Sequence, residues 1–247
     1  MSFPARAACV DTGSNAIRFM VADFVSPSLY EPVVMQRAPV RLGHQVFLNG
    51  RLTTVTMDGA VRAFAGFREE MDRLGVTHLR AVATSAVREA TNGDLLVERI
   101  DREAGIRLEV ITGSEEARLV HLAVGSRIDL TGGQWILVDL GGGSVEVSLA
   151  DDAGMLWSQS HTMGSVRLLE ELSSSVEDPG RFQRLLTDYI SVLRIPAPSQ
   201  YWDPSGVIAT GGNIESLALL AAATPDQNGV SRLLVEDLRR VIEHLSR

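Results

Sequence analysis

Residues 135–150 read WILVDLGGGSVEVSLA, and they are the strongest indication of the fold in the sequence. An apolar run leads to Asp139, and after a glycine turn apolar and polar residues alternate to Ala150. The pattern predicts a strand, a tight turn and a returning strand. Glycines let the backbone approach a ligand because they lack a Cβ, and successive N–H groups in such a turn make a concave anion site. The predicted phosphate turn comprises Gly141, Gly142, Gly143 and Ser144.

The same layout occurs near the start of the chain. Residues 8–24 read ACVDTGSNAIRFMVADF, in which an apolar lead-in reaches Asp11 and an apolar strand returns after the turn. The turn residues are Gly13, Ser14 and Asn15. Two such units, one opening each half of the chain, predict a duplicated domain with one phosphate loop from each half.

Three carboxylates in these two units are candidates for metal chemistry. Asp139 ends a strand, where it can hold a divalent cation directly or through water. Glu146 alternates with apolar neighbours on the returning strand and so points to one defined face. Asp11 occupies in the first unit the place that Asp139 has in the second. The alternatives are that both aspartates only cap turns and that Glu146 is a solvated strand residue.

Bulk composition narrows the class of protein. The chain has 247 residues, of which 45% are hydrophobic, and this is enough for two modest α/β domains or one large one. A formal charge of -8 argues against a broad nucleic-acid surface. The sequence has neither a signal peptide pattern nor an apolar run near the roughly 18 residues needed to cross a membrane. The single cysteine, Cys9, is expected to be a buried residue of a strand, and a cytoplasmic location is expected.

The order of predicted elements is that of a ribonuclease-H-like α/β fold. Strands are expected over 7–24 (two, around the turn), 31–41, 78–84, 106–111, 135–150 (two), 155–161 and, buried, 206–210. Helices are expected over 53–75, 94–105, 112–124, 181–193, 213–222 and 231–246. A short helix that carries Arg88 is expected to begin at 84–85, and another helix follows the turn at 163–167. Gly75 is expected to end the first of these helices. Loops are expected over 43–51, 125–133 (a link between domains) and 173–180, with a break at Pro196 and Pro198.

The start of the helix over 112–124 leaves one acidic residue available for chemistry. Thr112 and Glu115 fit a capping box, in which Glu115 bonds back to the residue before the helix. Glu116 has no such role and is a candidate catalytic carboxylate. Its simpler explanation is a favourable interaction with the helix dipole. A second glycine pair, Gly211 and Gly212, stands between a predicted strand and helix, where a ligand can approach a helix N-terminus.

Six motifs together resemble one family. DTGSNAIRF, ATSAVREATNG, ITGSEEARL, LVDLGGGSVEVSLA, MGSVRLLE and ATGGNIESLA occur in the order found in the exopolyphosphatase and guanosine pentaphosphate phosphohydrolase (Ppx/GppA) family, of the actin, Hsp70 and sugar-kinase superfamily. The resemblance implies two ribonuclease-H-like domains around a central cleft, over residues 1–125 and 126–247. The second is expected to lack its last helix. A homodimer is also implied.

The resemblance further implies hydrolysis of a phosphoanhydride bond that depends on Mg²⁺ or Mn²⁺. The implied substrates are inorganic polyphosphate, which loses its terminal phosphate, or guanosine pentaphosphate, which loses its 5′ γ-phosphate. The implied roles are general base for Glu116, phosphate contact for Arg88, phosphate binding for both turns and the glycine pair, and metal binding for Asp11, Asp139 and Glu146. From the residues alone, Arg88 fits a surface ion pair nearly as well.

Two other functions fit the sequence. One is a sensor that binds polyphosphate or a guanosine alarmone without turnover. The other is a sugar or acetate kinase of the same superfamily, against which the absence of large inserted subdomains counts. The sequence does not rank the two phosphorylated substrates.

Overall fold

The computed structural model describes residues 3–27, 29–173, 180–193, 195 and 202–245. By its internal contacts the chain divides into two compact units. Unit 1 comprises residues 1–112 and 166–187, and unit 2 comprises residues 113–165 and 188–247. Each unit contains one sheet, so the predicted α/β class is confirmed. The predicted domain boundary between residues 125 and 126 stays a prediction.

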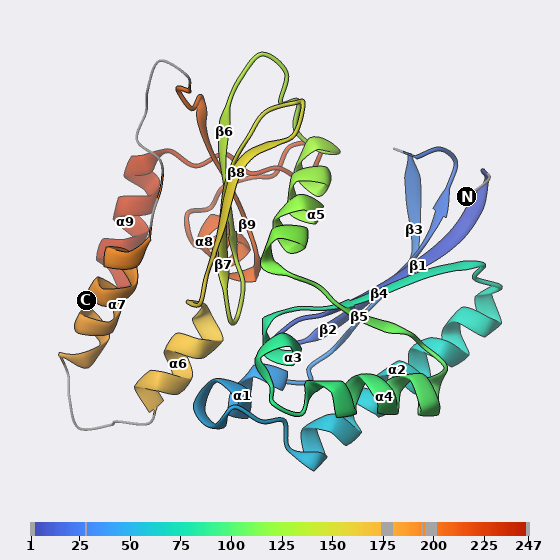
Figure 1. The fold of residues 1–247 in the computed structure, drawn as a ribbon. Coiled ribbons are helices and arrows are strands. Elements are labelled where there is room, and N and C mark those ends of the chain that lie inside the picture. Colours follow the sequence, from blue (N-terminus) through green and yellow to red (C-terminus); the bar gives the residue numbers. More distant parts are fainter. Residues whose placement is uncertain (1–2, 28, 174–179, 194, 196–201, 246–247) are drawn as a thin grey trace. The chain divides into compact units, whose positions relative to one another are not determined.

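The sheet of unit 1 has the order β3-β2-β1-β4-β5. Its strands are β1 (Ala5–Thr12), β2 (Ile17–Phe24), β3 (Tyr30–Ala38), β4 (His78–Ala83) and β5 (Leu108–Val110). The first three strands form an antiparallel meander, and β4 and β5 then join β1 in parallel. Parallel pairs need long crossover connections, which here contain the helices (Figure 1).

The helices of unit 1 follow the predicted order, with α1 as an additional helix. They are α1 (Leu42–Asn49), α2 (Thr54–Leu74), α3 (Ser85–Glu89) and α4 (Gly93–Ala104), joined later in the chain by α6 (Ser165–Ser173) and the first part of α7 (Arg181–Val192). Figure 1 shows α2 and α4 along one face of the sheet. Between them lies a dense core that includes Phe19, Phe64, Met71, Leu96, Ile100 and Ile106, all less than 2% exposed.

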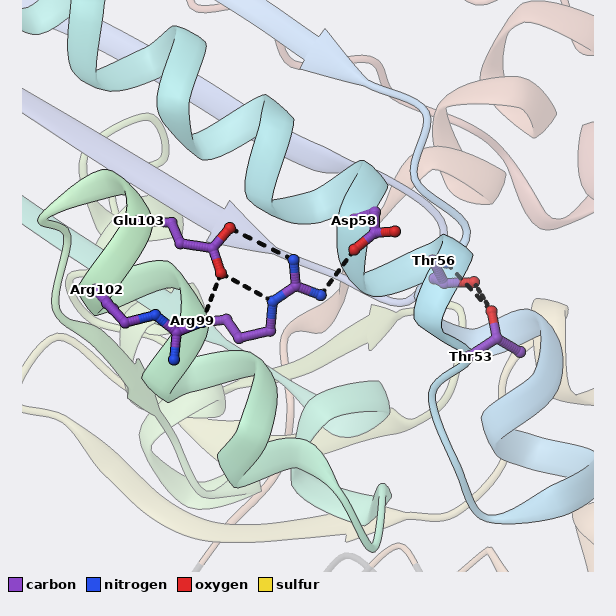
Figure 2. Close-up of polar contacts among 6 residues, drawn as sticks. All are labelled: Thr53, Thr56, Asp58, Arg99, Arg102 and Glu103. Atoms are coloured by element: carbon purple, nitrogen blue, oxygen red, sulfur yellow. Dashed lines mark hydrogen bonds and ion pairs between the residues drawn. The ribbon is translucent and has the colours of Figure 1, made fainter.

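Polar contacts fix α2 and its contact with α4 (Figure 2). Thr53 caps the helix, because its hydroxyl accepts a hydrogen bond from the backbone N–H of Thr56 (3.2 Å). Arg99 of α4 donates to Asp58 of α2 (2.7 Å) and to Glu103 one turn further along α4 (3.1 Å). Gly75 ends α2 in the left-handed conformation (φ 66°), as predicted.

The loop predicted over 43–51 is wrong, since residues 42–49 form α1. Leu42 and Val46 are buried at helical spacing, and Gly50 ends the helix in the left-handed conformation with its N–H bonded to the Val46 carbonyl (2.8 Å). Two turns of helix give too short a repeat for the apolar period to stand out.

The prediction that Cys9 is buried is also wrong. Cys9 lies in β1 as expected, but its side chain is exposed. Successive side chains of a strand point to opposite faces. Ala8 and Val10 enter the core, so Cys9 faces away from it.

Charged contacts hold α6 on unit 1. Arg167 donates to both carboxylate oxygens of Glu89 (2.8 and 2.6 Å), and its guanidinium lies 4.2 Å from the ring centroid of Phe47. His44 of α1 pairs through Nδ1 with the buried Glu170. Residues 166–187 accordingly belong to unit 1, although they follow three strands of unit 2 in sequence.

The sheet of unit 2 has the order β8-β7-β6-β9, which repeats β3-β2-β1-β4 of unit 1. Its strands are β6 (Trp135–Leu140), β7 (Val145–Ala150), β8 (Met155–His161) and β9 (Gly206–Thr210). Strands β8, β7 and β6 are antiparallel, and β9 pairs with β6 in parallel. The repetition of both order and direction confirms the predicted duplication.

The helices of unit 2 are α5 (Gly113–Gly125), α8 (Gly212–Leu220) and α9 (Val235–Leu245), with the end of α7. Helix α5 packs on β6, β7 and β8 (Figure 1). A small core joins them, consisting of Val124, Leu130, Leu137 and Ala150. Leu130 comes from the segment predicted to link the domains, and in the structure it packs within unit 2.

Four predictions for the second half need correction or lie outside the described residues. Strand β9 forms as predicted but is not buried, since Val207 is 64% exposed. Helix α9 begins at Val235, later than residue 231. The predicted loop over 173–180 and the break at Pro196 and Pro198 fall largely or wholly outside the described residues. Among the described residues, the structure has no helix long and apolar enough to cross a membrane.

Candidate active site

Three carboxylates converge in unit 2. Asp139 of β6 and Glu146 of β7 are register partners across the antiparallel pair, and Glu116 comes from the first turn of α5. One carboxylate oxygen from each lies within 4.8 Å of those of the other two. Glu146 is only 2% exposed, so the alternative that it is a solvated strand residue is wrong. A set of carboxylate oxygens suits a hard divalent cation such as Mg²⁺ or Mn²⁺.

Two hydroxyl groups donate to this cluster. Thr210, the last residue of β9, donates to Oδ1 of Asp139 (2.6 Å). Ser160 of β8 donates to Oε1 of Glu146 (2.7 Å). Each strand carboxylate is therefore fixed by a neighbouring strand.

The predicted turn between β6 and β7 is present, and residues 164 and 165 pack against it. The backbone N–H of Gly141 bonds to the Ser144 carbonyl (3.0 Å), and the N–H of Ser165 bonds to the Gly141 carbonyl (3.2 Å). Gly143 and Ser144 are buried. A Cβ on Gly164 would lie 2.5 Å from the carbonyl carbon and oxygen of Gly142 and 2.6 Å from the Gly143 nitrogen. Gly164 therefore lets the backbone at Ser165, the last residue of this part of unit 2, lie directly against the turn.

Substitution Gly164→Ala is expected to displace this turn. The added Cβ would clash with backbone atoms, which cannot rotate away, and overpacking of this kind typically costs about 1–3 kcal/mol. We expect a lower melting temperature together with weaker binding of the phosphorylated substrate. Gly66→Ala is a control for adding a Cβ without a clash, since nothing lies within 4 Å of its Cβ position and its backbone is not left-handed. A Gly164→Ala protein with an unchanged Michaelis constant for polyphosphate would contradict this role of the turn.

The glycine pair after β9 has a similar constraint. Gly211 has φ 107°, and a Cβ there would lie 2.4 Å from the Leu140 carbonyl oxygen. Helix α8 begins at Gly212. The strand–glycine–helix order predicted for Gly211 and Gly212 is confirmed, and their role in phosphate binding stays a prediction.

The corresponding turn of unit 1 lies between β1 and β2. The Gly13 N–H bonds to the Ala16 carbonyl (3.2 Å), and Asp11 pairs with Arg18 (3.2 Å). The hydroxyls of Ser14 and Ser85 lie 3.0 Å apart and are buried, which ties the turn to α3. Asn15 is exposed. Asp11 belongs to unit 1, whereas the three clustered carboxylates belong to unit 2.

Arg88 also belongs to unit 1. It is half-buried at the end of α3, and its guanidinium donates to the backbone carbonyl of Ile111 (2.7 Å). This bond joins α3 to the residue that follows β5. A contact of Arg88 with phosphate stays a prediction.

Charges around the cluster distinguish Glu116 from its neighbour. Glu115 forms an ion pair with Arg118 one turn along α5 (2.7 and 2.9 Å). Glu116 instead contributes an oxygen to the carboxylate cluster.

His161 ends β8 beside Ser160 and is buried, and burial lowers the pKa of its imidazole below the ordinary value.

Four residues of this site are not among those predicted from the sequence: Gly113, Ser160, Gly164 and Thr210. Gly164 and Thr210 stand within two of the quoted motifs, and Gly113 within a third. Their roles depend on which strand lies beside which, and on what a Cβ would meet. Ser160 carries no signal in the sequence, since it lies outside all six motifs.

Comparison with known proteins places the chain in a family. The model of the Ppx/GppA phosphatase family matches residues 20–247. The chain belongs to the Ppx/GppA phosphatase family. Exopolyphosphatase 1 of Mycobacterium leprae is 32% identical over 98% of this chain and 73% of its own length. Membership assigns the chain to the phosphatase class of hydrolases.

Solved structures agree with this assignment. A crystal structure of an exopolyphosphatase from Cytophaga hutchinsonii has a TM-score of 0.77 at 27% identity, over 97% of this chain and 79% of that one. The Ppx/GppA family member of Aquifex aeolicus has a TM-score of 0.75 at 26% identity, over 97% and 78%. The likeness confirms the actin-like two-domain fold class expected from the motifs.

Proposed function

We propose that this Ppx/GppA phosphatase is an exopolyphosphatase, which releases the terminal phosphate of inorganic polyphosphate in a reaction that requires Mg²⁺ or Mn²⁺. The observation that carries the proposal is the cluster of Glu116, Asp139 and Glu146. We propose polyphosphate rather than guanosine pentaphosphate as the substrate because similar proteins of Mycobacterium leprae and Cytophaga hutchinsonii are named exopolyphosphatases.

The proposed division of roles follows from position and burial. Asp139 and Glu146 stand on adjacent strands and are held by hydroxyl donors, so we assign them to the metal ion. When bound, a divalent cation would neutralise charge on the phosphate oxygens. A metal-binding role for Asp11 of unit 1 stays an expectation from the family resemblance.

Glu116 is assigned as the general base. It is half-buried in the first turn of α5, whereas the other two carboxylates stand on the sheet. Attack of water on a phosphoryl group needs a proton acceptor within hydrogen-bond reach. Glu116 would accept that proton, while the N–H groups of the turn between β6 and β7 would stabilise charge on the transferred phosphoryl group.

The proposal is tested by phosphate release from short-chain polyphosphate with added Mg²⁺ or Mn²⁺ and with EDTA. We expect release with either metal and a loss to background in EDTA. The loss should reverse when excess metal is restored. Guanosine pentaphosphate, assayed beside it, measures the substrate preference. Binding of polyphosphate without release under any condition would contradict the proposal and favour the sensor.

A further inference from the structure

We propose that Thr210 and Ser160 are positioning residues, whose hydroxyls fix the two strand carboxylates in the orientation that binds the metal ion. The inference rests on the metal site of the proposed function. Its basis is a row of side chains that crosses the whole sheet of unit 2. Ser160, Glu146, Asp139 and Thr210 are successive register partners on β8, β7, β6 and β9.

The row has hydroxyls at both ends and carboxylates in the middle. Thr210 donates to Oδ1 of Asp139 (2.6 Å) and Ser160 donates to Oε1 of Glu146 (2.7 Å). Each bond engages one oxygen of its carboxylate and restrains rotation of the group. Like charges this close repel one another, so without restraint the carboxylates would turn apart whenever a cation is absent. The two hydroxyls oppose that movement from opposite sides.

Helix α5 packs against the same row. A Cβ on Gly113 would lie 2.5 Å from Cβ and 2.7 Å from Oγ of Ser160, and 3.6 Å from Oε1 of Glu146. The absence of a side chain at Gly113 lets the first turn of α5, which carries Glu116, lie on Ser160. Ser160 therefore contacts both the helix and the strand that supply carboxylates.

The two hydroxyls differ in exposure, so their removal is expected to weaken metal binding to different extents. Thr210 is half-buried, whereas Ser160 is exposed. A water molecule can take the place of an exposed donor more readily than that of a buried one. Loss of the Thr210 hydroxyl should weaken metal binding more than loss of the Ser160 hydroxyl.

The test is a titration of metal-free protein with Mn²⁺ in the absence of substrate. Electron paramagnetic resonance measures the free Mn²⁺, from which the affinity is obtained. Removal of a residue that orients a metal ligand typically weakens binding about 10–100-fold. We expect this loss in Thr210→Val and a smaller one in Ser160→Ala. Thr210→Ser, which keeps the hydroxyl, should bind Mn²⁺ as tightly as wild type. Ser158→Ala is the matched control, since Ser158 accepts a hydrogen bond from Ser148 (3.1 Å), the next pair on the same face of the same two strands, and not from a carboxylate-bearing residue.

The outcomes separate this inference from the proposed function. Wild-type affinity in both Thr210→Val and Ser160→Ala would overturn the inference while leaving the metal site intact. A Thr210→Ser protein as weak as Thr210→Val would also overturn it, because packing of the methyl group would then be responsible. If wild-type protein itself binds no Mn²⁺, the metal site of the proposed function fails, and the inference fails with it. Ser160→Ala changes an exposed residue, so it gives an answer even if Thr210→Val does not fold.

Discussion

Replacement of Glu116 by Gln is expected to lower the rate of phosphate release from polyphosphate by about 10²–10⁴-fold, the usual contribution of a general base. Glutamine has nearly the shape of glutamate but cannot accept a proton from the attacking water. Asp139 and Glu146 are unchanged in this variant, so binding of substrate and of Mn²⁺ should persist. Turnover and equilibrium binding of polyphosphate, measured on the same preparation, check this result.

The matched control for this variant is Glu115→Gln. Glu115 adjoins Glu116 in the first turn of α5, but its carboxylate pairs with Arg118. Both substitutions remove one negative charge from the same end of the helix, so a general loss of helix-dipole stabilisation would affect them alike. We expect near-normal turnover for Glu115→Gln. Comparable losses in both variants would contradict the general-base assignment.

Mn²⁺ binding distinguishes two roles for Glu116. Its carboxylate oxygen lies within 4.8 Å of those of Asp139 and Glu146, a separation that also suits a third metal ligand. If Glu116→Gln loses Mn²⁺ affinity together with turnover, Glu116 is a ligand and the base must be another group. If the variant keeps its Mn²⁺ affinity and loses turnover, the result supports Glu116 as the general base.

Local patterns in the sequence predict most of this fold. Apolar runs that end in Asp11 and Asp139 predict the paired strands, and Gly75 predicts the end of α2. Helix α1 is missed because two turns give too few apolar positions for a period to show. The exposure of Cys9 is missed because alternation along a strand does not say which of its two faces meets the core.

The candidate site was predicted less completely, for a related reason. Glu116, Asp139 and Glu146 stand in recognisable motifs, and their convergence follows from the fold that the motifs imply. Thr210 and Ser160 act through register across the sheet, which joins residues 71 and 14 positions apart in the sequence. A single sequence contains no record of such pairings. The constraints at Gly113 and Gly164 likewise come from backbone and side-chain atoms that only the fold brings near.

Replacement of Glu146 by Gln is expected to change stability in opposite directions with and without metal. In EDTA, the wild-type protein holds three carboxylates with oxygens within 4.8 Å, and Glu146 is almost fully buried. A buried carboxylate beside two others of the same charge is unfavourable without a compensating cation. Glutamine removes that charge, and its side-chain oxygen can still accept the hydrogen bond from Ser160. Glu146→Gln should therefore melt at a higher temperature than wild type in EDTA.

Added Mn²⁺ should reverse this order. A cation that binds the folded state alone stabilises it by about 2.7 kcal/mol when its concentration is 100 times the dissociation constant. Wild type should gain this stability, and Glu146→Gln should gain little because one ligand has lost its charge. Thermal unfolding of both proteins in EDTA and in Mn²⁺ gives the four melting temperatures. Equal stabilisation of both proteins by Mn²⁺ would place the cation elsewhere. A lower melting temperature for Glu146→Gln in EDTA would mean that the buried carboxylate serves the fold rather than the ion.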